Sequence, residues 1–104
     1  MARWDVYVNA ARRGSSDTPY LLDVQADLLG DLRTRVVVPL RRSDAVPRPI
    51  SRLQPRLRIA DEEVVMDTPM IVGAPVTALG SRVQSLESQA AVLLGAIDFL
   101  LTGA

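Results

Sequence analysis

A strongly apolar segment near the end of this 104-residue chain constrains its fold more than any other feature. Apolar residues recur there at the three- and four-residue spacing of one helix face. They are Leu86, Ala90, Leu93, Leu94, Ile97 and Leu101. The other side is also apolar and carries Val92, Ala96 and Phe99. Because a helix that is apolar almost all round has to be covered on both sides, we expect one side to pack on the chain's own strands and the other on a second copy. The segment therefore predicts a C-terminal helix and a homodimer.

Short apolar runs precede this segment and are typical of β-strands. The expected strands cover residues 4–9, 20–24, 35–40, 57–59, 64–66 and 76–79. Polar turns are expected at 12–19, 27–31 and 61–63, and Pro39 is expected to end its strand or mark a sheet edge. Strands followed by one helix predict an α+β or small-barrel architecture, in a single domain over residues 1–104.

Prolines and helix-capping residues mark the remaining boundaries. Pro47, Pro49 and Pro55 make residues 43–55 a long irregular excursion, because neither a helix nor a strand interior tolerates that density. Ser85 is expected to cap the helix, with Glu87 in its first turn, where the helix dipole favours a carboxylate.

Three residue types are missing from the chain, and their absence limits its chemistry. It has no cysteine, histidine or lysine, and all twelve basic residues are arginines. This excludes disulfides, zinc thiolates, Ser-His and Cys-His pairs, and P-loop or Schiff-base lysines. Twelve acidic residues cancel the arginines, which disfavours direct nucleic-acid binding. We expect no cofactor, no metal, no signal peptide and no membrane contact, and hence a cytoplasmic protein.

Two charged groups and the chain end are candidate sites. Asp23, Asp27 and Asp31 lie four residues apart and could bind a cation on a helix, but the turn signals around them favour turn and cap roles. Half of the arginines lie in the proline-rich region and form either a solvated face or a docking surface for an acidic segment or phosphate. They are Arg41, Arg42, Arg48, Arg52, Arg56 and Arg58.

The apolar chain end is the third candidate. Residues 100–104 either tuck into the chain's own core or form a tip presented to a partner. Asp98 lies close to the predicted helix C-terminus, where a carboxylate opposes the dipole. We therefore expect Asp98 to be exposed or paired.

Several segments, in order along the chain, carry a family resemblance. Residues 20–29 read as a strand ending in Asp-Val-Gln-Ala-Asp and two leucines, and residues 35–40 as an aliphatic strand ending in Pro-Leu. Residues 4–7, 59–62 and 74–80 agree as well. Together they resemble the CcdB toxins of bacterial toxin–antitoxin modules. The resemblance implies an SH3-like barrel with a C-terminal helix, a symmetric homodimer and no catalytic activity.

The resemblance also implies partners and contact residues. CcdB toxins bind the A subunit of DNA gyrase and trap the cleaved gyrase–DNA complex until a CcdA-like antitoxin releases it. By position, the family's gyrase contacts fall on Leu28, Leu29, Asp98, Leu101, Thr102, Gly103 and Ala104. We expect antitoxin contacts at Arg41, Arg42, Leu28 and Leu29. The family's terminal Trp-Gly-Ile falls on residues 102–104, where only the glycine matches.

Two alternatives stay open on the sequence. The same barrel hosts messenger-RNA endoribonucleases of the MazF/Kid type, which here would have to use arginines and hydroxyls. The second alternative is a CcdB homologue that does not poison gyrase, because Thr102 replaces the terminal tryptophan. Zero net charge and the CcdB-like motifs favour the toxin over the endoribonuclease.

Overall fold

The computed structural model describes residues 1–11 and 17–103. Within them, an antiparallel sheet of seven strands is followed by one α-helix at the C-terminus. The elements are β1 (Asp5–Asn9), β2 (Tyr20–Asp23), β3 (Thr34–Arg42), β4 (Arg56–Ile59), β5 (Glu62–Met66), β6 (Val72–Pro75), β7 (Leu79–Ser85) and α1 (Ala90–Thr102). Single 3-10 turns connect them, namely η1 (Asp27–Leu29), η2 (Ser43–Ala45), η3 (Thr68–Met70), η4 (Val76–Ala78) and η5 (Glu87–Gln89).

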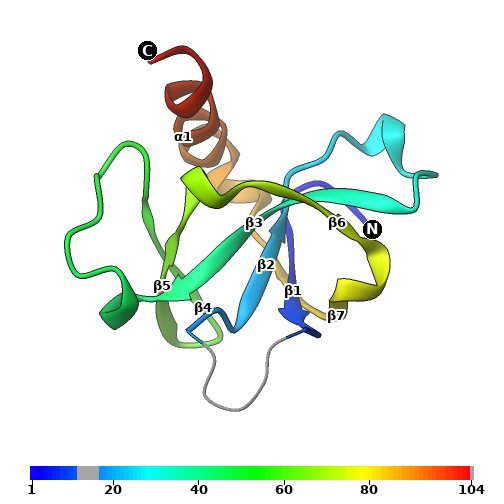
Figure 1. Cartoon of the computed structure of the whole chain (residues 1–104), viewed down its shortest axis with the longest axis horizontal. Helices are drawn as coiled ribbons and strands as arrows, with labels where there is room; N and C mark the ends of the chain where they lie inside the picture. The colour runs from blue at the N-terminus through cyan, green and yellow to red at the C-terminus, as the bar shows by residue number, and fades with distance from the viewer. Residues whose placement is uncertain (12–16, 104) are drawn as a thin grey trace.

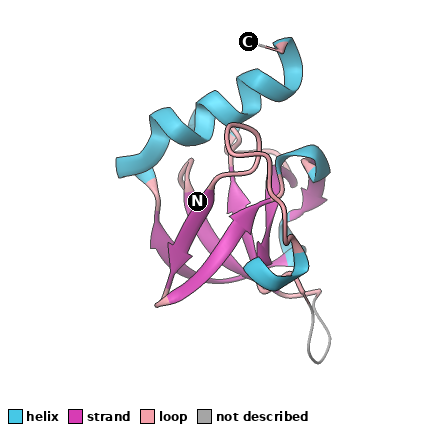
Figure 2. Ribbon diagram, turned by 90° about the vertical axis from the view of Figure 1, so that its left-hand side faces the viewer, coloured by secondary structure: helices cyan, strands magenta, loops and turns pink. Residues whose placement is uncertain are grey.

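The sheet curls into a half-barrel. Its strand order is β4-β5-β3-β2-β1-β7, and β6 pairs with the first half of β3. Figure 2 shows α1 lying across one end of the curled sheet, with its C-terminal end pointing away from the strands. This confirms the expected mainly β fold with a C-terminal helix. No helix among the described residues is long and apolar enough to cross a bilayer.

Apolar side chains cover both faces of the sheet. Val6 and Leu22 belong to the larger core, which α1 closes with Leu93, Ala96 and Ile97. The next residues along the strands point the other way, because strand side chains alternate. Five of them form a smaller cluster on the opposite face: Tyr7, Leu21, Val37, Ala74 and Leu79. Two apolar faces explain why the strand at residues 35–40 reads as an almost continuous valine run.

The strand β3 does not end at Pro39, contrary to one of the two expected roles of this proline. Residues 34–37 pair with β6 and residues 40–42 pair with β5. Pro39 therefore lies where the strand changes partner. Its carbonyl accepts a hydrogen bond from the Asp67 N–H at 3.0 Å. The nitrogen of Pro39 faces the same side of the strand as its carbonyl. Because proline has no N–H, the gap between the two partner strands leaves no backbone donor of Pro39 unpaired.

The predicted strand at residues 76–79 is wrong. Residues 76–78 form the turn η4, and strands flank it on both sides. The chain has to turn here, because β6 pairs with β3 whereas β7 pairs with β1. The predicted turn at 61–63 is shifted, since Ala60 and Asp61 form it at φ of 49° and 67° and Glu62 already pairs with Ile59. Most of the predicted loop at 12–19 lies outside the described residues.

The helix begins later than predicted. The Oγ of Ser85 accepts a hydrogen bond from the Glu87 N–H at 3.1 Å, but Ser85 is not the predicted helix cap, because the N-cap position of η5 is Leu86 and that of α1 is Gln89. Each of the two predicted apolar lines contains residues that are buried and residues that are exposed. Leu93, Ala96 and Ile97 are buried against the sheet, whereas three large apolar residues of the helix are exposed. These are Val92, Leu94 and Leu101.

Candidate functional site

The two leucines that follow the Asp-Val-Gln motif lie on an exposed turn. Leu28 is 93% exposed and Leu29 is 49% exposed, and all three residues of η1 face solvent. Leu32 and Val36 are exposed next along the chain. We call residues 27–32 the leucine loop. Exposed apolar side chains that gather in one place are typical of a protein interaction site.

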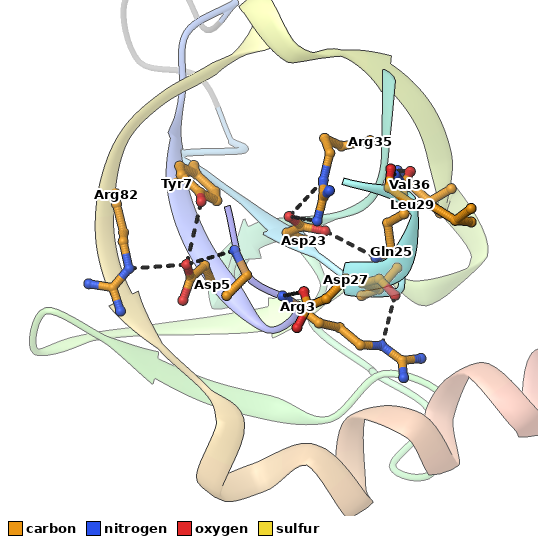
Figure 3. A network of polar contacts seen from close by, with 12 residues as sticks. Arg3, Asp5, Tyr7, Asp23, Gln25, Asp27, Leu29, Arg35, Val36 and Arg82 are labelled. Atoms are coloured by element: carbon orange, nitrogen blue, oxygen red, sulfur yellow. Dashed lines mark hydrogen bonds and ion pairs between the residues drawn. The ribbon is translucent and has the colours of Figure 1, made fainter. Parts of the chain in front are cut away.

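Gln25 connects this loop to the sheet. Its Oε1 accepts a hydrogen bond from the Val36 N–H at 3.0 Å, and its Nε2 donates one to the Leu29 carbonyl at 2.8 Å. The backbone N–H of Gln25 donates to Oδ1 of Asp23 at 3.0 Å, which forms an Asx turn. Figure 3 shows Asp23, Gln25 and Leu29 as parts of one polar network.

Asp23 and Arg35 form a buried ion pair under the same loop. Asp23 is 0% and Arg35 is 1% exposed, and Nε and Nη2 of Arg35 both donate to Oδ2 of Asp23, the first at 2.9 Å. Burial raises the pKa of Asp23, and the hydrogen bonds from Arg35 and from the Gln25 N–H act against this rise. The Nη1 of Arg35 has no hydrogen-bond partner among the described residues. The expected turn role of Asp23 is confirmed, but its ion pair was not predicted.

Asp27, the last residue of the Asp-Val-Gln-Ala-Asp motif, is hydrogen-bonded to the N-terminal segment. Oδ1 of Asp27 accepts a hydrogen bond from the Arg3 N–H at 2.6 Å, and Nε of Arg3 donates to the Val24 carbonyl at 3.0 Å. The guanidinium of Arg3 also stacks on Trp4, 4.5 Å from the ring centroid. Asp23 and Gln25 therefore both bond to β3, whereas Asp27 joins the leucine loop to the N-terminal segment. No group of metal-ligating side chains occurs in the described part of the chain.

A second polar group lies on β1. Oδ2 of Asp5 lies 3.1 Å from Nε of Arg82 and accepts a hydrogen bond from the Tyr7 hydroxyl at 3.4 Å. Burial, followed by the charges of Asp5 and Asp23, raises the pKa of Tyr7. The phenol therefore stays protonated near neutral pH and donates to Asp5, as a structural hydrogen bond requires.

The end of α1 projects into solvent. Leu101 is 72% exposed, and Thr102 and Gly103 are exposed beside it. The Thr102 hydroxyl donates to the Asp98 carbonyl at 2.7 Å, and Asp98 itself is exposed. Gly103 has a φ of 74°, and its N–H donates to the Phe99 carbonyl at 2.9 Å, which closes the helix. Residues 101–103 therefore form a tip, whereas Ala104 lies outside the described residues.

A comparison with protein families identifies the chain. The family model described as "CcdB protein" matches residues 3–103. The chain belongs to the CcdB family. No curated protein matches it significantly. Membership of the CcdB family implies a toxin of a toxin–antitoxin system, and CcdB toxins are gyrase poisons, not enzymes. The endoribonuclease alternative therefore does not apply.

The residues expected to contact gyrase lie in two places on this CcdB chain. Figure 1 shows the end of α1 at one upper corner of the molecule, and the segment between β2 and β3 that carries Leu28 and Leu29 at the other. Asp98, Leu101, Thr102 and Gly103 share the first place. A single chain therefore does not bring the tip and the leucine loop together.

The residues expected to contact the antitoxin are also separated. Arg41 and Arg42 lie at the far end of β3 from the leucine loop. Arg41 lies 3.7 Å from Asp67 and 3.8 Å from Asp17, and Arg42 lies 3.8 Å from Glu62. Carboxylates of the same chain thus partly neutralise both arginines.

Three of the four remaining arginines of this group, Arg52, Arg56 and Arg58, also make contacts within the chain. Arg56 pairs with Glu63 at 3.0 Å, and Arg58 donates to the Asp61 carbonyl at 2.9 Å. Arg52 stacks on Phe99, 4.6 Å from the ring centroid. These contacts favour a solvated face over a concentrated anion site.

Proposed function

We propose that this CcdB protein forms a single toxin domain over residues 1–104 and binds the A subunit of DNA gyrase as a homodimer in the cytoplasm. It traps the cleaved gyrase–DNA complex, and a CcdA-like antitoxin releases it. The observation that carries the proposal is the leucine loop, in which a turn that carries an almost fully exposed leucine has its backbone bonded to the buried side chain of Gln25. A turn whose backbone is already fixed binds a partner with a smaller loss of conformational entropy.

The homodimer is supported by the outer face of α1. Leu94 and Leu101 lie seven residues apart, on the same face of the helix, and both are exposed. A second copy would cover Leu94 and would place two helix tips beside each other on one symmetry axis, with Leu101 left exposed at each tip. Pairing of two chains would also allow a tip and a leucine loop from different copies to contact one gyrase surface.

The dimer can be measured directly. Light scattering of the purified protein should give about twice the 11.3 kDa of one chain. Leu94→Arg should reduce this mass towards that of one chain, because it buries a charge in the proposed interface. Ser88→Arg, on η5 and also exposed, is the matched control and should stay dimeric. A monomer at micromolar concentration in the unsubstituted protein would contradict the proposal.

The antitoxin contacts are proposed at Leu28, Leu29, Arg41 and Arg42. Nine residues of β3 separate the two ends, a length of about 30 Å. An extended antitoxin segment of about nine or ten residues would span this distance. Such a segment would bring apolar residues to the leucine loop and carboxylates to the arginines.

Leu28→Ser tests gyrase binding by the leucine loop. The variant should weaken binding to a gyrase A fragment by about 30-fold, the effect of a 2 kcal/mol hot-spot residue. Its thermal unfolding should be unchanged, because Leu28 packs against almost nothing in the free protein. Ile50→Ser, an exposed aliphatic residue of the proline-rich region, is the matched control and should bind normally. Equal binding by both variants and the unsubstituted protein would exclude the leucine loop as the gyrase contact.

A second candidate function is a CcdB homologue that does not poison gyrase. One observation favours it, because position 102 carries a threonine whose hydroxyl already bonds to the Asp98 carbonyl. The tip therefore offers a partner much less apolar area than an indole would.

A further inference from the structure

We propose that Gln25 is a positioning residue, which sets the geometry in which Leu28 and Leu29 are presented and does not itself contact the partner. The inference rests on the proposed function for the role of the leucines. Its structural half can be tested on the free protein alone.

The leucine loop needs such a connection because apolar packing does not hold it. All three residues of η1 are exposed. The hydrogen bonds within the loop are local, from the Leu29 N–H to the Ala26 carbonyl and from the Gly30 N–H to the Asp27 carbonyl, both at 3.0 Å. Local bonds define the shape of a turn, but its orientation depends on longer-range contacts. One of these joins Oδ1 of Asp27 to the Arg3 N–H in the N-terminal segment, and it does not reach β3.

The side chain of Gln25 supplies the connection between the loop and β3. It is 6% exposed, and its two amide atoms bond to the Leu29 carbonyl on the loop and to the Val36 N–H on β3. The backbone N–H of Gln25 donates to the carboxylate of Asp23, and this carboxylate also accepts hydrogen bonds from Arg35. A continuous series of buried and partly buried contacts therefore runs from the sheet to the leucine loop (Figure 3).

These contacts fit a glutamine and not an ionised glutamate. The Val36 N–H needs an acceptor and the Leu29 carbonyl needs a donor, and a primary amide offers one of each. An ionised carboxylate offers only acceptors, so in Gln25→Glu an oxygen would face the Leu29 carbonyl. This substitution keeps the shape of the side chain and turns one attractive contact into a repulsive one.

The chain contains a matched control for this substitution. Gln84 on β7 also joins two backbone groups, since its Oε1 accepts from the Ala60 N–H at 3.1 Å and its Nε2 lies 3.5 Å from the Arg58 carbonyl. It acts at the turn between β4 and β5 and has no contact with the leucine loop. Gln84→Glu therefore makes the same chemical change at a different place.

The first experiment follows amide hydrogen exchange in the free protein. In Gln25→Glu, exchange at Leu29 and Gly30 should become about tenfold faster, while core strands keep their protection. In Gln84→Glu these two amides should exchange as in the unsubstituted protein. Gln25→Met, which removes both hydrogen bonds without adding charge, should resemble Gln25→Glu and serves if the glutamate variant does not fold. Unchanged exchange at Leu29 and Gly30, or equal acceleration along the whole chain, would overturn the inference.

The second experiment measures binding to a gyrase A fragment. Gln25→Glu should weaken binding about tenfold without altering Leu28 itself, and Gln84→Glu should bind normally. Faster exchange in the loop with unchanged affinity would overturn the positioning role. Failure of the proposed function has a different signature, since Leu28→Ser would then bind gyrase normally whatever the exchange rates show.

Discussion

Arg35→Met is expected to lower the free energy of unfolding by about 3–5 kcal/mol at neutral pH, as is typical when one partner of a buried ion pair is removed. Methionine fills a similar space but leaves the Asp23 carboxylate, which is 0% exposed, without its guanidinium. Urea unfolding followed by the fluorescence of Trp4, the single tryptophan and a buried one, measures the change.

The matched control for this prediction is an exposed ion pair. Arg56→Met breaks the contact with Glu63, in which both side chains are about half exposed, and should cost less than about 1 kcal/mol. The double variant Asp23→Asn/Arg35→Met removes the stranded charge and keeps an acceptor for the Gln25 N–H. It should be more stable than Arg35→Met alone at neutral pH. A double variant no more stable than the single one would show that lost packing, and not charge, is the cause.

The stability deficit of Arg35→Met should depend on pH. Burial raises the pKa of Asp23 in the native protein, and the variant loses the hydrogen bonds from Arg35 that oppose this rise. When a carboxyl has a higher pKa in the folded than in the unfolded state, the folded state binds more protons, so stability falls as pH rises through that raised pKa. The deficit should therefore be largest at neutral pH and shrink towards the ordinary aspartate range. Unfolding curves from pH 4 to pH 7 test this direction.

The sequence predicts the type of most elements in this chain because their signals are local. Alternation predicts β1, the valine run predicts β3, and the spacing of leucines predicts α1. The errors occur where pairing with a strand far away in the sequence determines the backbone conformation. Residues 76–78 have a strand-like composition, yet the chain has to leave β3 there and reach β1. Pro39 is tolerated within β3 because it lies between the residues that pair with β6 and the residues that pair with β5.

The candidate site shows the same limit. The resemblance to CcdB singles out residues 20–29, but local patterns predict only turn and cap roles for their aspartates. The partners of Asp23, Gln25 and Asp27 lie between 11 and 24 residues away in sequence for their longest-range bonds. Periodicity carries no information about such contacts. The sequence contains one signal for the ion pair. Asp23 follows two leucines in one strand and Arg35 precedes the valines of the next, so opposite charges occur on neighbouring buried strands.

Thr102→Trp is expected to raise the affinity for a gyrase A fragment by about 30- to 700-fold, which corresponds to the 2–4 kcal/mol of an aromatic hot-spot residue. The structure supports a large effect because the end of α1 is already fixed. Gly103 closes the helix through the Phe99 carbonyl, and Leu101 is exposed beside position 102. An indole there would extend an existing apolar tip, at the loss of one exposed hydrogen bond from the Thr102 hydroxyl.

The control for this prediction is a tryptophan on the same surface but away from the tip. Ser88→Trp places an indole on η5, at the opposite end of the helical segment, and should leave gyrase affinity unchanged. Titration calorimetry or surface plasmon resonance with both variants separates a specific gain from general stickiness, because an indole anywhere adds apolar area. Equal affinities for Thr102→Trp and the unsubstituted protein would mean that this tip does not occupy a gyrase site. The function would then be that of the homologue that does not poison gyrase, and the exposed leucines would have to serve another partner.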